Sequence, residues 1–277
     1  YGSEEQKLRY LPPMVTGRAV AAIAMTEPDA GSDLKAIRTT AIREADGYVI
    51  NGSKTYITNG RHADFVVVAA KTDPAAGARG ISLLIVDCDK AGFSKGPTLD
   101  KVGQHSSDTC ELFFENVRVP ASALLGREGE GFAYLMAQLP QERLSVAIEC
   151  QAAAQRAFDE ALAYTKQRKA FGQRVFDLQN TRFQLASMAT ELQVGWAHID
   201  WAVARHVQGL LTTQEAAATK LWHSELQGRV TDAALQLFGG AGYMNEYLIA
   251  QLYRDARVTR IYAGTSEIMR ELIGRKL

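Results

Sequence analysis

The chain has 277 residues, 47% of them hydrophobic, which is enough to bury one large core or two medium-sized ones. Lysine plus arginine and aspartate plus glutamate both number 31, and this balance gives no sign of a nucleic-acid or membrane partner. No apolar run approaches the roughly 20 residues that span a bilayer. The cysteines Cys88, Cys110 and Cys150 lack metal-site or disulfide spacing, which favours reduced thiols in a reducing compartment and predicts no metal site.

Up to about residue 125 the sequence is typical of short strands joined by tight turns, after a first segment that reads as the tail of a helix. The Asp46-Gly47 pair separates two strand-like runs and is a hairpin signal. Further apolar or β-branched runs follow at 65–70 and 81–86, and another strand ends at Pro120. We therefore expect an antiparallel sheet or barrel.

After Gly131 the turn residues become rare and apolar residues recur at spacings near three and four. This periodicity predicts long amphipathic helices. The periodic segments are 144–162, 185–203 and 221–237, with a fourth from about Tyr247 to Thr259. Gly239-Gly240 and Phe171-Gly172 interrupt the pattern where turns belong. The second half of the chain is thus predicted to be a bundle of four helices.

Six motifs follow one another in order along the chain. They are Ile23–Asp33, Tyr56–Gly60, Glu111–Pro120, Arg168–Gly172, Gln236–Gly240 and Tyr262–Glu267. Together they resemble the acyl-CoA dehydrogenase family over nearly the whole sequence. The resemblance implies an α+β fold with an antiparallel β-barrel or sheet as middle domain (19–125), followed by a C-terminal four-helix bundle (126–277). Residues 1–18 are then expected to be the tail of an N-terminal helical domain, the rest of which is absent.

The resemblance implies a flavoprotein of fatty acid β-oxidation that carries out the α,β-dehydrogenation of an acyl-CoA thioester with FAD. A base removes the α proton while the β hydrogen leaves as hydride to flavin N5. Electrons would pass to an electron-transferring flavoprotein, in the bacterial cytoplasm or the mitochondrial matrix. Two alternatives stay open. One is a flavin acyl-CoA oxidase that uses O₂, and the other is a non-catalytic subunit of the same fold.

The late turn lacks the base that most of the family carries. Ala263 stands where the commonest family form has Glu, and a methyl group cannot accept a proton. The long-chain and isovaleryl branches instead have the Glu at the start of the first bundle helix, and Glu142 in Pro140–Leu144 matches that position. We predict Glu142 as the base, with a pKa raised by burial, and Ala263 as a backbone N–H donor to the thioester oxygen. Alternatively, Glu142 is a first-turn acid that complements the helix dipole.

The remaining site residues are carried over from the family motifs. Loop residues 25–32 are expected under the flavin ring, where a hydroxyl of Thr26 binds the pyrimidine edge and Thr58 the N5 side. The predicted contacts of this part of FAD are Ile23, Met25, Thr26, Gly31, Ser32, Tyr56 and Thr58. Ser32 could instead be a helix N-cap, and Tyr56 an ordinary strand aromatic. The predicted substrate contacts are Ser32, Ser107, Arg143 and Gly264.

The resemblance also places a clamp for the adenosine-diphosphate part of the neighbouring subunit's flavin. Arg168 suits pyrophosphate because its planar fork binds two oxygens at once. The members of this clamp are Arg168, Phe171, Gln179, Gln236, Gly239 and Gly240. Thr265 and Glu267 would contact the pyrophosphate and ribityl region. A clamp shared between subunits implies a homo-oligomer, either a dimer or a homotetramer.

Overall fold

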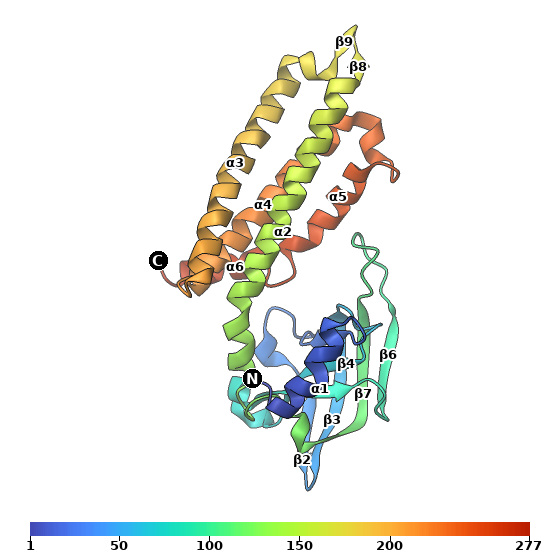
Figure 1. Cartoon of the computed structure of the whole chain (residues 1–277), viewed down its shortest axis with the longest axis vertical. Helices are drawn as coiled ribbons and strands as arrows, with labels where there is room; N and C mark the ends of the chain where they lie inside the picture. Colours follow the sequence, from blue (N-terminus) through green and yellow to red (C-terminus); the bar gives the residue numbers. More distant parts are fainter. The chain divides into compact units, whose positions relative to one another are not determined.

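The computed structural model describes residues 1–277, and the chain divides into two units (Figure 1). The strand unit comprises Tyr1–Lys101 and His105–Ala137, and the helical unit comprises Val102–Gln104 and Gln138–Leu277. Strands dominate the first unit and helices the second, which confirms the predicted α+β class. None of the helices combines the length and apolar character needed to cross a bilayer.

The strand unit consists of one helix, a seven-stranded sheet and three short 3₁₀ helices. Its elements are α1 (Glu4–Val15), β1 (Ala21–Ala24), η1 (Leu34–Ala36), β2 (Thr40–Glu44), β3 (Gly47–Ile57), β4 (Phe65–Lys71), η2 (Pro74–Gly80), β5 (Ile81–Asp87), β6 (Phe93–Thr98), β7 (Cys110–Pro120) and η3 (Ala121–Ala123).

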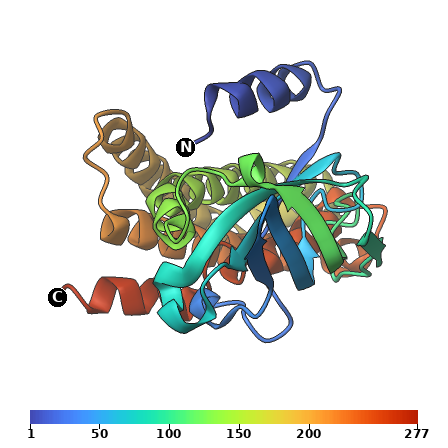
Figure 2. The same cartoon turned by 90° about the horizontal axis from the view of Figure 1, so that it is seen from below.

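The sheet, whose curl is visible in Figure 2, has the strand order β1-β4-β2-β3-β7-β6, and β5 pairs with β4. Most neighbours are antiparallel, as predicted, but β1 and β2 both run parallel to β4, so the sheet is mixed. Alternation of apolar residues within a strand carries no information about strand direction, which is why the sequence did not reveal these two pairs.

The predicted hairpin at Asp46-Gly47 joins β2 to β3, where Glu44 pairs with Gly47. Gly47 serves a second purpose that its turn position did not suggest. A Cβ added to it would lie 2.0 Å from the carbonyl oxygen of Val119 on β7. Only glycine allows this close approach of the two strands.

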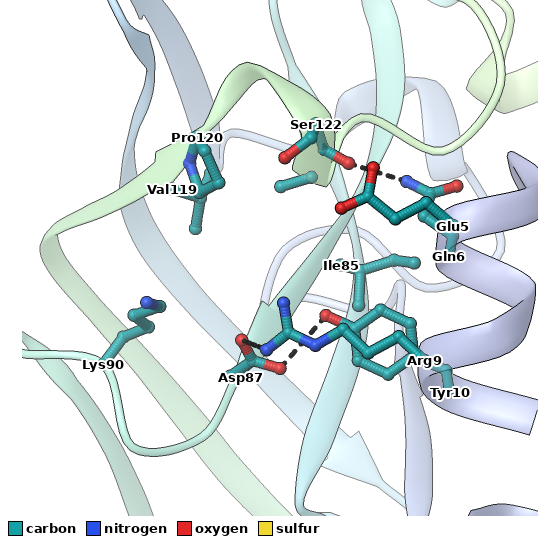
Figure 3. Close-up of a pocket in the computed structure, with 11 residues that line it drawn as sticks. Glu5, Gln6, Arg9, Tyr10, Ile85, Asp87, Lys90, Val119, Pro120 and Ser122 are labelled. Atoms are coloured by element: carbon teal, nitrogen blue, oxygen red, sulfur yellow. Dashed lines mark hydrogen bonds and ion pairs between the residues drawn. The ribbon is translucent and has the colours of Figure 1, made fainter. Parts of the chain in front are cut away.

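Helix α1 is held against the sheet by polar contacts (Figure 3). The Gln6 side chain donates to the Ser122 carbonyl at 2.8 Å, while Arg9 and Tyr10 both reach the Asp87 carboxylate, at 2.7 and 3.1 Å. The cavity between these groups has a volume of about 60 Å³, which is room for about two water molecules. The cavity is too small for a cofactor. The hydrogen bonds around it anchor α1 to the sheet.

The helical unit has five α-helices, of which α2, α3 and α4 are long, and a short hairpin, so it contains one short helix more than the four predicted. Its elements are α2 (Gly131–Gln167), β8 (Lys169–Ala170), β9 (Gln173–Arg174), η4 (Val175–Asp177), α3 (Gln179–Val207), α4 (Thr213–Phe238), η5 (Gly239–Tyr243), α5 (Leu248–Ala256), η6 (Arg257–Arg260) and α6 (Ser266–Gly274). The first residues of α2, up to Ala137, belong to the strand unit. The core forms where a buried alanine stripe of α2 meets larger apolar side chains of α3 and α4. Ala157, Leu192 and Leu226 are representative members.

The start of α2 differs from the prediction. The helix begins at Gly131 rather than at Pro140, which lies inside it. A proline is tolerated best in the first turn, and this preference misplaced the predicted start. Glu142 therefore lies well beyond the first turn, where the charge of the helix dipole has faded. The alternative interpretation of Glu142 as a dipole-complementing acid loses its basis.

A polar network lies inside the helical core around His223, which is completely buried. Its Nδ1 lies 3.0 Å from Oε1 of Gln151, and the amide nitrogen of Gln151 donates to the Leu192 carbonyl at 3.0 Å. His223 therefore donates from Nδ1, while its Nε2 has no partner. Desolvation, with a smaller contribution from the charge of His198, lowers the pKa of His223 from 6.5 to about 3.

This buried histidine should make the protein less stable in acid. Below pH 6.5 the unfolded chain protonates His223 and the folded chain does not, so stability is lost as the pH falls from 6.5 towards about 3. We expect a slope of up to about 1.4 kcal/mol per pH unit from this residue. Urea unfolding at a series of pH values should give a flatter profile for His223→Gln than for the wild type, and parallel profiles would contradict the assignment.

Candidate functional site

In the strand unit, the segment 25–32 leaves β1 through a tight turn. The backbone N–H of Glu27 donates to the Ala30 carbonyl at 3.1 Å, and the reverse bond measures 3.0 Å. Pro28 occupies the second position of this turn, where its fixed φ is favourable. The turn returns the chain sharply and leaves Gly31 and Ser32 exposed.

A buried ion pair fixes this loop to the sheet. Nζ of Lys54 lies 2.9 Å from Oε1 of Glu27, and the two side chains are 0% and 6% exposed. Lys54 also donates to the Met25 carbonyl at 2.9 Å, while Glu27 accepts the backbone N–H groups of Arg38 and Thr39 at 2.5 and 3.0 Å. Every polar atom named here has a partner, so the loop is rigidly placed.

The pKa values of the pair follow from burial and mutual attraction. Burial alone would raise the pKa of Glu27, but the Lys54 ammonium and the hydrogen bonds to the carboxylate outweigh it and lower the pKa. Burial lowers the pKa of Lys54 to about 8, and Glu27 limits the fall. Both groups are charged at neutral pH.

The end of β3 lies alongside this loop, because the N–H of Thr55 donates to the Thr26 carbonyl at 2.9 Å. The β3–β7 register shifts between Lys54 and Ile57, and Tyr56 lies within this irregularity with φ 59°. Such a bulge redirects a side chain out of the sheet. Tyr56 is accordingly 68% exposed although it belongs to a central strand.

The other predicted residues of the strand unit vary in exposure. Ile23 and Thr58 are exposed, whereas Met25 and Thr26 are half-buried. The 3₁₀ helix η1 is capped by Asp33, so the N-cap alternative for Ser32 is wrong.

Ser107 lies in the loop that precedes β7 and is half-buried. Its Oγ lies 3.3 Å from the Thr109 hydroxyl, and its carbonyl accepts Lys101 Nζ at 2.7 Å. The internal contacts of this loop hold Ser107 in place.

In the helical unit, the late turn contains two successive residues with left-handed backbone, Ala263 at φ 52° and Gly264 at φ 96°. Thr265 then caps α6 by accepting the N–H of Ile268 at 3.3 Å. The Gly264 carbonyl accepts Nζ of Lys220, on α4, at 2.8 Å. A small residue at Ala263 limits the cost of the unusual φ.

The same turn packs against α2 next to Glu142. A Cβ built on Gly264 would lie 3.8 Å from Nη2 of Arg143, an ordinary van der Waals contact, and 2.6 Å from Cε of Met269, whose methyl group would have to move. Arg143 is only 4% exposed, and its Nε has no partner. The structure thus brings the helix turn that carries Glu142 to the Ala263-Gly264 turn, two segments far apart in the sequence.

The Glu142 side chain remains accessible to solvent, yet neighbouring atoms remove part of its hydration. This desolvation raises the pKa of Glu142, and the Arg143 charge opposes the rise. Burial lowers the pKa of Arg143, and Glu142 counteracts it. A carboxylate with a raised pKa is a stronger base, which is what proton abstraction from carbon requires.

A second group of predicted residues lies at the opposite end of α2 (Figure 1). Phe171 and Gly172 form the tip of the β8–β9 hairpin with positive φ, and Phe171 is 92% exposed. Tyr164 stacks on Phe238 with ring centroids 4.1 Å apart, so the end of α4 lies at this same end of the helical unit.

The predicted clamp residues at this end present free surfaces. Arg168, Gln179 and Gln236 are exposed. No atom lies within 4 Å of a Cβ built on Gly239 or Gly240. A ligand or a second chain could therefore approach the backbone of these glycines closely.

Comparison with known proteins identifies the family. Residues 22–117 match the family model described as acyl-CoA dehydrogenase, middle domain, and residues 129–277 match the one described as acyl-CoA dehydrogenase, C-terminal domain. The chain belongs to the acyl-CoA dehydrogenase family. This membership confirms the resemblance on which the sequence interpretation depends.

Among curated relatives of this family member, the long-chain specific acyl-CoA dehydrogenase of Sus scrofa mitochondria is 49% identical over 279 residues. The alignment covers 100% of this chain and 65% of the relative, so the chain spans just under two thirds of that protein's length.

Solved structures agree with this assignment. The acyl-CoA dehydrogenase from Geobacillus kaustophilus has a TM-score of 0.98 at 52% identity, covering 100% of this chain and 73% of that one. The butyryl-CoA dehydrogenase from Megasphaera elsdenii has a TM-score of 0.96 at 39% identity, covering 100% and 72%.

Three buried charged residues of this acyl-CoA dehydrogenase family member were missed by the sequence interpretation. Glu27 lies inside a recognised motif but was not assigned a role. Lys54 and Lys220 lie in a strand and a helix that are otherwise largely apolar on their inner faces. A charged residue at a core position was the available signal, and its partner is far away in the sequence.

The buried pair beneath the 25–32 loop should tolerate loss of one partner poorly. Lys54→Met would leave the Glu27 carboxylate buried without its cation, and we expect a loss of about 3–5 kcal/mol in unfolding free energy. Adding Glu27→Gln to this variant should recover part of the loss. The exposed pair Arg38–Asp29, with N–O distance 3.1 Å, provides a matched control. Arg38→Met should cost less than about 1 kcal/mol, and equal losses in urea unfolding would contradict this picture.

Proposed function

We propose that this chain carries out the FAD-dependent α,β-dehydrogenation of an acyl-CoA thioester, with Glu142 as the base that removes the α proton. The observation that carries the proposal is the packing of the Ala263-Gly264 turn against Arg143. Because Glu142 immediately precedes Arg143 on α2, this contact supports a site to which the turn contributes a backbone amide and α2 a carboxylate.

Two groups with different roles are needed because the C–H bond at the α carbon is only weakly acidic. Removing its proton leaves negative charge on the thioester oxygen, which needs a hydrogen-bond donor. The N–H of Ala263 is the proposed donor, and it requires no side chain. Glu142 then accepts the proton, and the raised pKa favours this acceptance. The buried Arg143 guanidinium adds positive charge next to both.

The residues present fit FAD in two respects. Exposed Tyr56 beside the rigid 25–32 loop offers an aromatic face for a flat ring, in the strand unit. Exposed Phe171, with the open glycines Gly239 and Gly240, offers an apolar and close-approach surface in the helical unit. When bound, FAD would supply the acceptor for the β hydride at N5.

The proposed FAD contacts are assigned by position in the family motifs. Those of the strand unit are Ile23, Met25, Thr26, Gly31, Ser32, Tyr56 and Thr58. Those of the helical unit are Arg168, Phe171, Gln179, Gln236, Gly239, Gly240, Thr265 and Glu267. Ser32, Ser107, Arg143 and Gly264 are the proposed substrate contacts.

The exposure of the Phe171 hairpin supports a homo-oligomer, a dimer or a tetramer. A phenylalanine that is 92% exposed at the tip of a two-stranded hairpin gains no stability from its own chain. We propose that it and Arg168 cover the adenosine-diphosphate part of the partner's FAD. Electrons would leave to an electron-transferring flavoprotein, and the compartment would be the bacterial cytoplasm or the mitochondrial matrix. The three unpaired cysteines suit a reducing compartment.

Glu142→Gln should stop α-proton abstraction without releasing FAD. We expect the rate of anaerobic flavin bleaching by a panel of acyl-CoAs to fall by about 10²–10⁴-fold, because a neutral amide cannot accept the proton. Glu160→Gln is the control, because this half-buried glutamate of α2 is paired with Arg156, and it should bleach at the wild-type rate. Wild-type bleaching by Glu142→Gln would refute the assignment. Rapid reoxidation of the reduced flavin in air would favour the acyl-CoA oxidase. Failure of the wild-type protein to bind FAD would favour the non-catalytic subunit.

Arg168→Ala should loosen FAD. Losing a charge-assisted hydrogen-bond pair costs roughly 1.5–3 kcal/mol, which is about a tenfold to hundredfold weaker affinity. Flavin retained after gel filtration is the measurement. Arg174→Ala removes an arginine of the same hairpin that is already paired with Asp177 at 2.8 Å, and it should retain flavin. Full retention by Arg168→Ala would argue against the clamp.

A further inference from the structure

Lys220 is a buried cation without a carboxylate partner. It lies on α4 with 0% exposure, and Nζ donates to the Gly264 carbonyl at 2.8 Å. An ammonium has three donors, and burial without a counter-charge costs several kcal/mol. A methionine of similar size would fill the same space at lower cost.

A second cation lies at the same turn. The Arg143 guanidinium is 4% exposed, and Nη2 comes within 3.8 Å of the Cβ position of Gly264. The nearby Glu225 carboxylate accepts the Ser266 hydroxyl at 2.7 Å and lies 3.6 Å from Arg260, so other groups already occupy it. Lys220 and Arg143 thus bring two buried cations to the turn without a carboxylate in direct contact with either. The carboxylates that act on them, Glu142 on Arg143 and Glu225 and Glu267 on Lys220, do so from a distance.

The hydrogen bond from Lys220 holds the part of the turn whose backbone conformation is least favourable. Ala263 and Gly264 both have left-handed φ, and a non-glycine residue in this conformation costs about 1 kcal/mol or more unless its surroundings hold it. Thr265 holds the C-terminal side of the turn by capping α6. The Lys220 ammonium holds the carbonyl of Gly264, which lies between Ala263 and Thr265 in the sequence. Together these contacts restrain the backbone on the C-terminal side of Ala263.

We propose that Lys220 is a positioning residue for the thioester. Its ammonium holds the Gly264 carbonyl so that the Ala263 N–H faces the thioester oxygen, and its charge favours the negative charge that develops on that oxygen. The proposal rests on the function proposed above. It predicts that Lys220 matters for ligands that carry a thioester carbonyl and not for the rest of the CoA molecule.

The test compares two ligands on the FAD-loaded protein. One is a trans-2-enoyl-CoA, which has the thioester carbonyl, and the other is the S-alkyl-CoA thioether of equal chain length, which lacks it. Dissociation constants come from the perturbation of the flavin spectrum. We expect Lys220→Met to weaken enoyl-CoA binding by about tenfold or more, with less than about a twofold change for the thioether. Equal losses for both ligands, or none, would overturn the proposal.

Hydrogen exchange supplies a readout that does not need a ligand. Amides of 261–268 should exchange faster in Lys220→Met than in the wild type, while those of the buried part of α3 should not change. Ser224→Ala is the matched control. It removes a buried hydroxyl from the next turn of α4 that bonds only the Leu221 carbonyl of its own helix. Unchanged exchange at the turn in Lys220→Met would also overturn the proposal.

Different results would overturn the proposed function and the proposed role of Lys220. A wild-type protein that binds neither ligand would overturn both the proposed function and the role of Lys220. A wild-type protein that binds and is reduced by acyl-CoA, but whose Lys220→Met variant treats the two ligands alike, would overturn the role of Lys220 alone. If Lys220→Met does not fold, Lys220→Gln serves for the same comparison, since its side chain is neutral and too short to reach Gly264.

Discussion

The packing of the Ala263-Gly264 turn against α2 is the constraint on which the rest of the helical unit's site depends. Gly264 adopts a φ of 96° that disfavours a side chain, and Met269 and Arg143 pack against it. The left-handed conformation of two successive residues turns the chain sharply into α6. Because of this contact, a turn near the end of the chain lies against the helix turn of α2 that carries Arg143 and, next to it in sequence, Glu142.

A buried lysine that donates to a loop carbonyl occurs in both units. In the strand unit, Lys54 holds the Met25 carbonyl and is neutralised by Glu27. In the helical unit, Lys220 holds the Gly264 carbonyl without a carboxylate. Both lysines donate to a loop carbonyl, but only Lys54 has a carboxylate in contact with its ammonium group. A directly paired lysine stabilises a loop, whereas a lysine without a carboxylate in contact adds positive potential that a bound anionic group can use.

The proposed transfer of the base from the late turn to α2 is compatible with the packing of the turn against Arg143. A turn that carries Ala263 still offers its N–H, and a helix that carries Glu142 offers a carboxylate with a raised pKa. Helix α2 is already well formed at Glu142, so the side chain leaves from a rigid backbone. Rigid support of a general base is what proton transfer from carbon requires, since a small displacement is costly.

The sequence by itself determined the features that depend on local patterns. The Asp46-Gly47 hairpin, the helical second half and the family motifs follow from turn chemistry, periodicity and residue identity, and Glu142 emerged as a candidate because Ala263 cannot accept a proton. Local patterns do not encode which distant groups meet. The parallel pairing of β1 and β2 with β4, the Glu27–Lys54 pair and the contact of Lys220 with Gly264 were therefore decided by the tertiary structure. The start of α2 at Gly131 was also decided there, because Leu135 and its neighbours pack into the core of the strand unit and so extend the helix on the N-terminal side of Pro140.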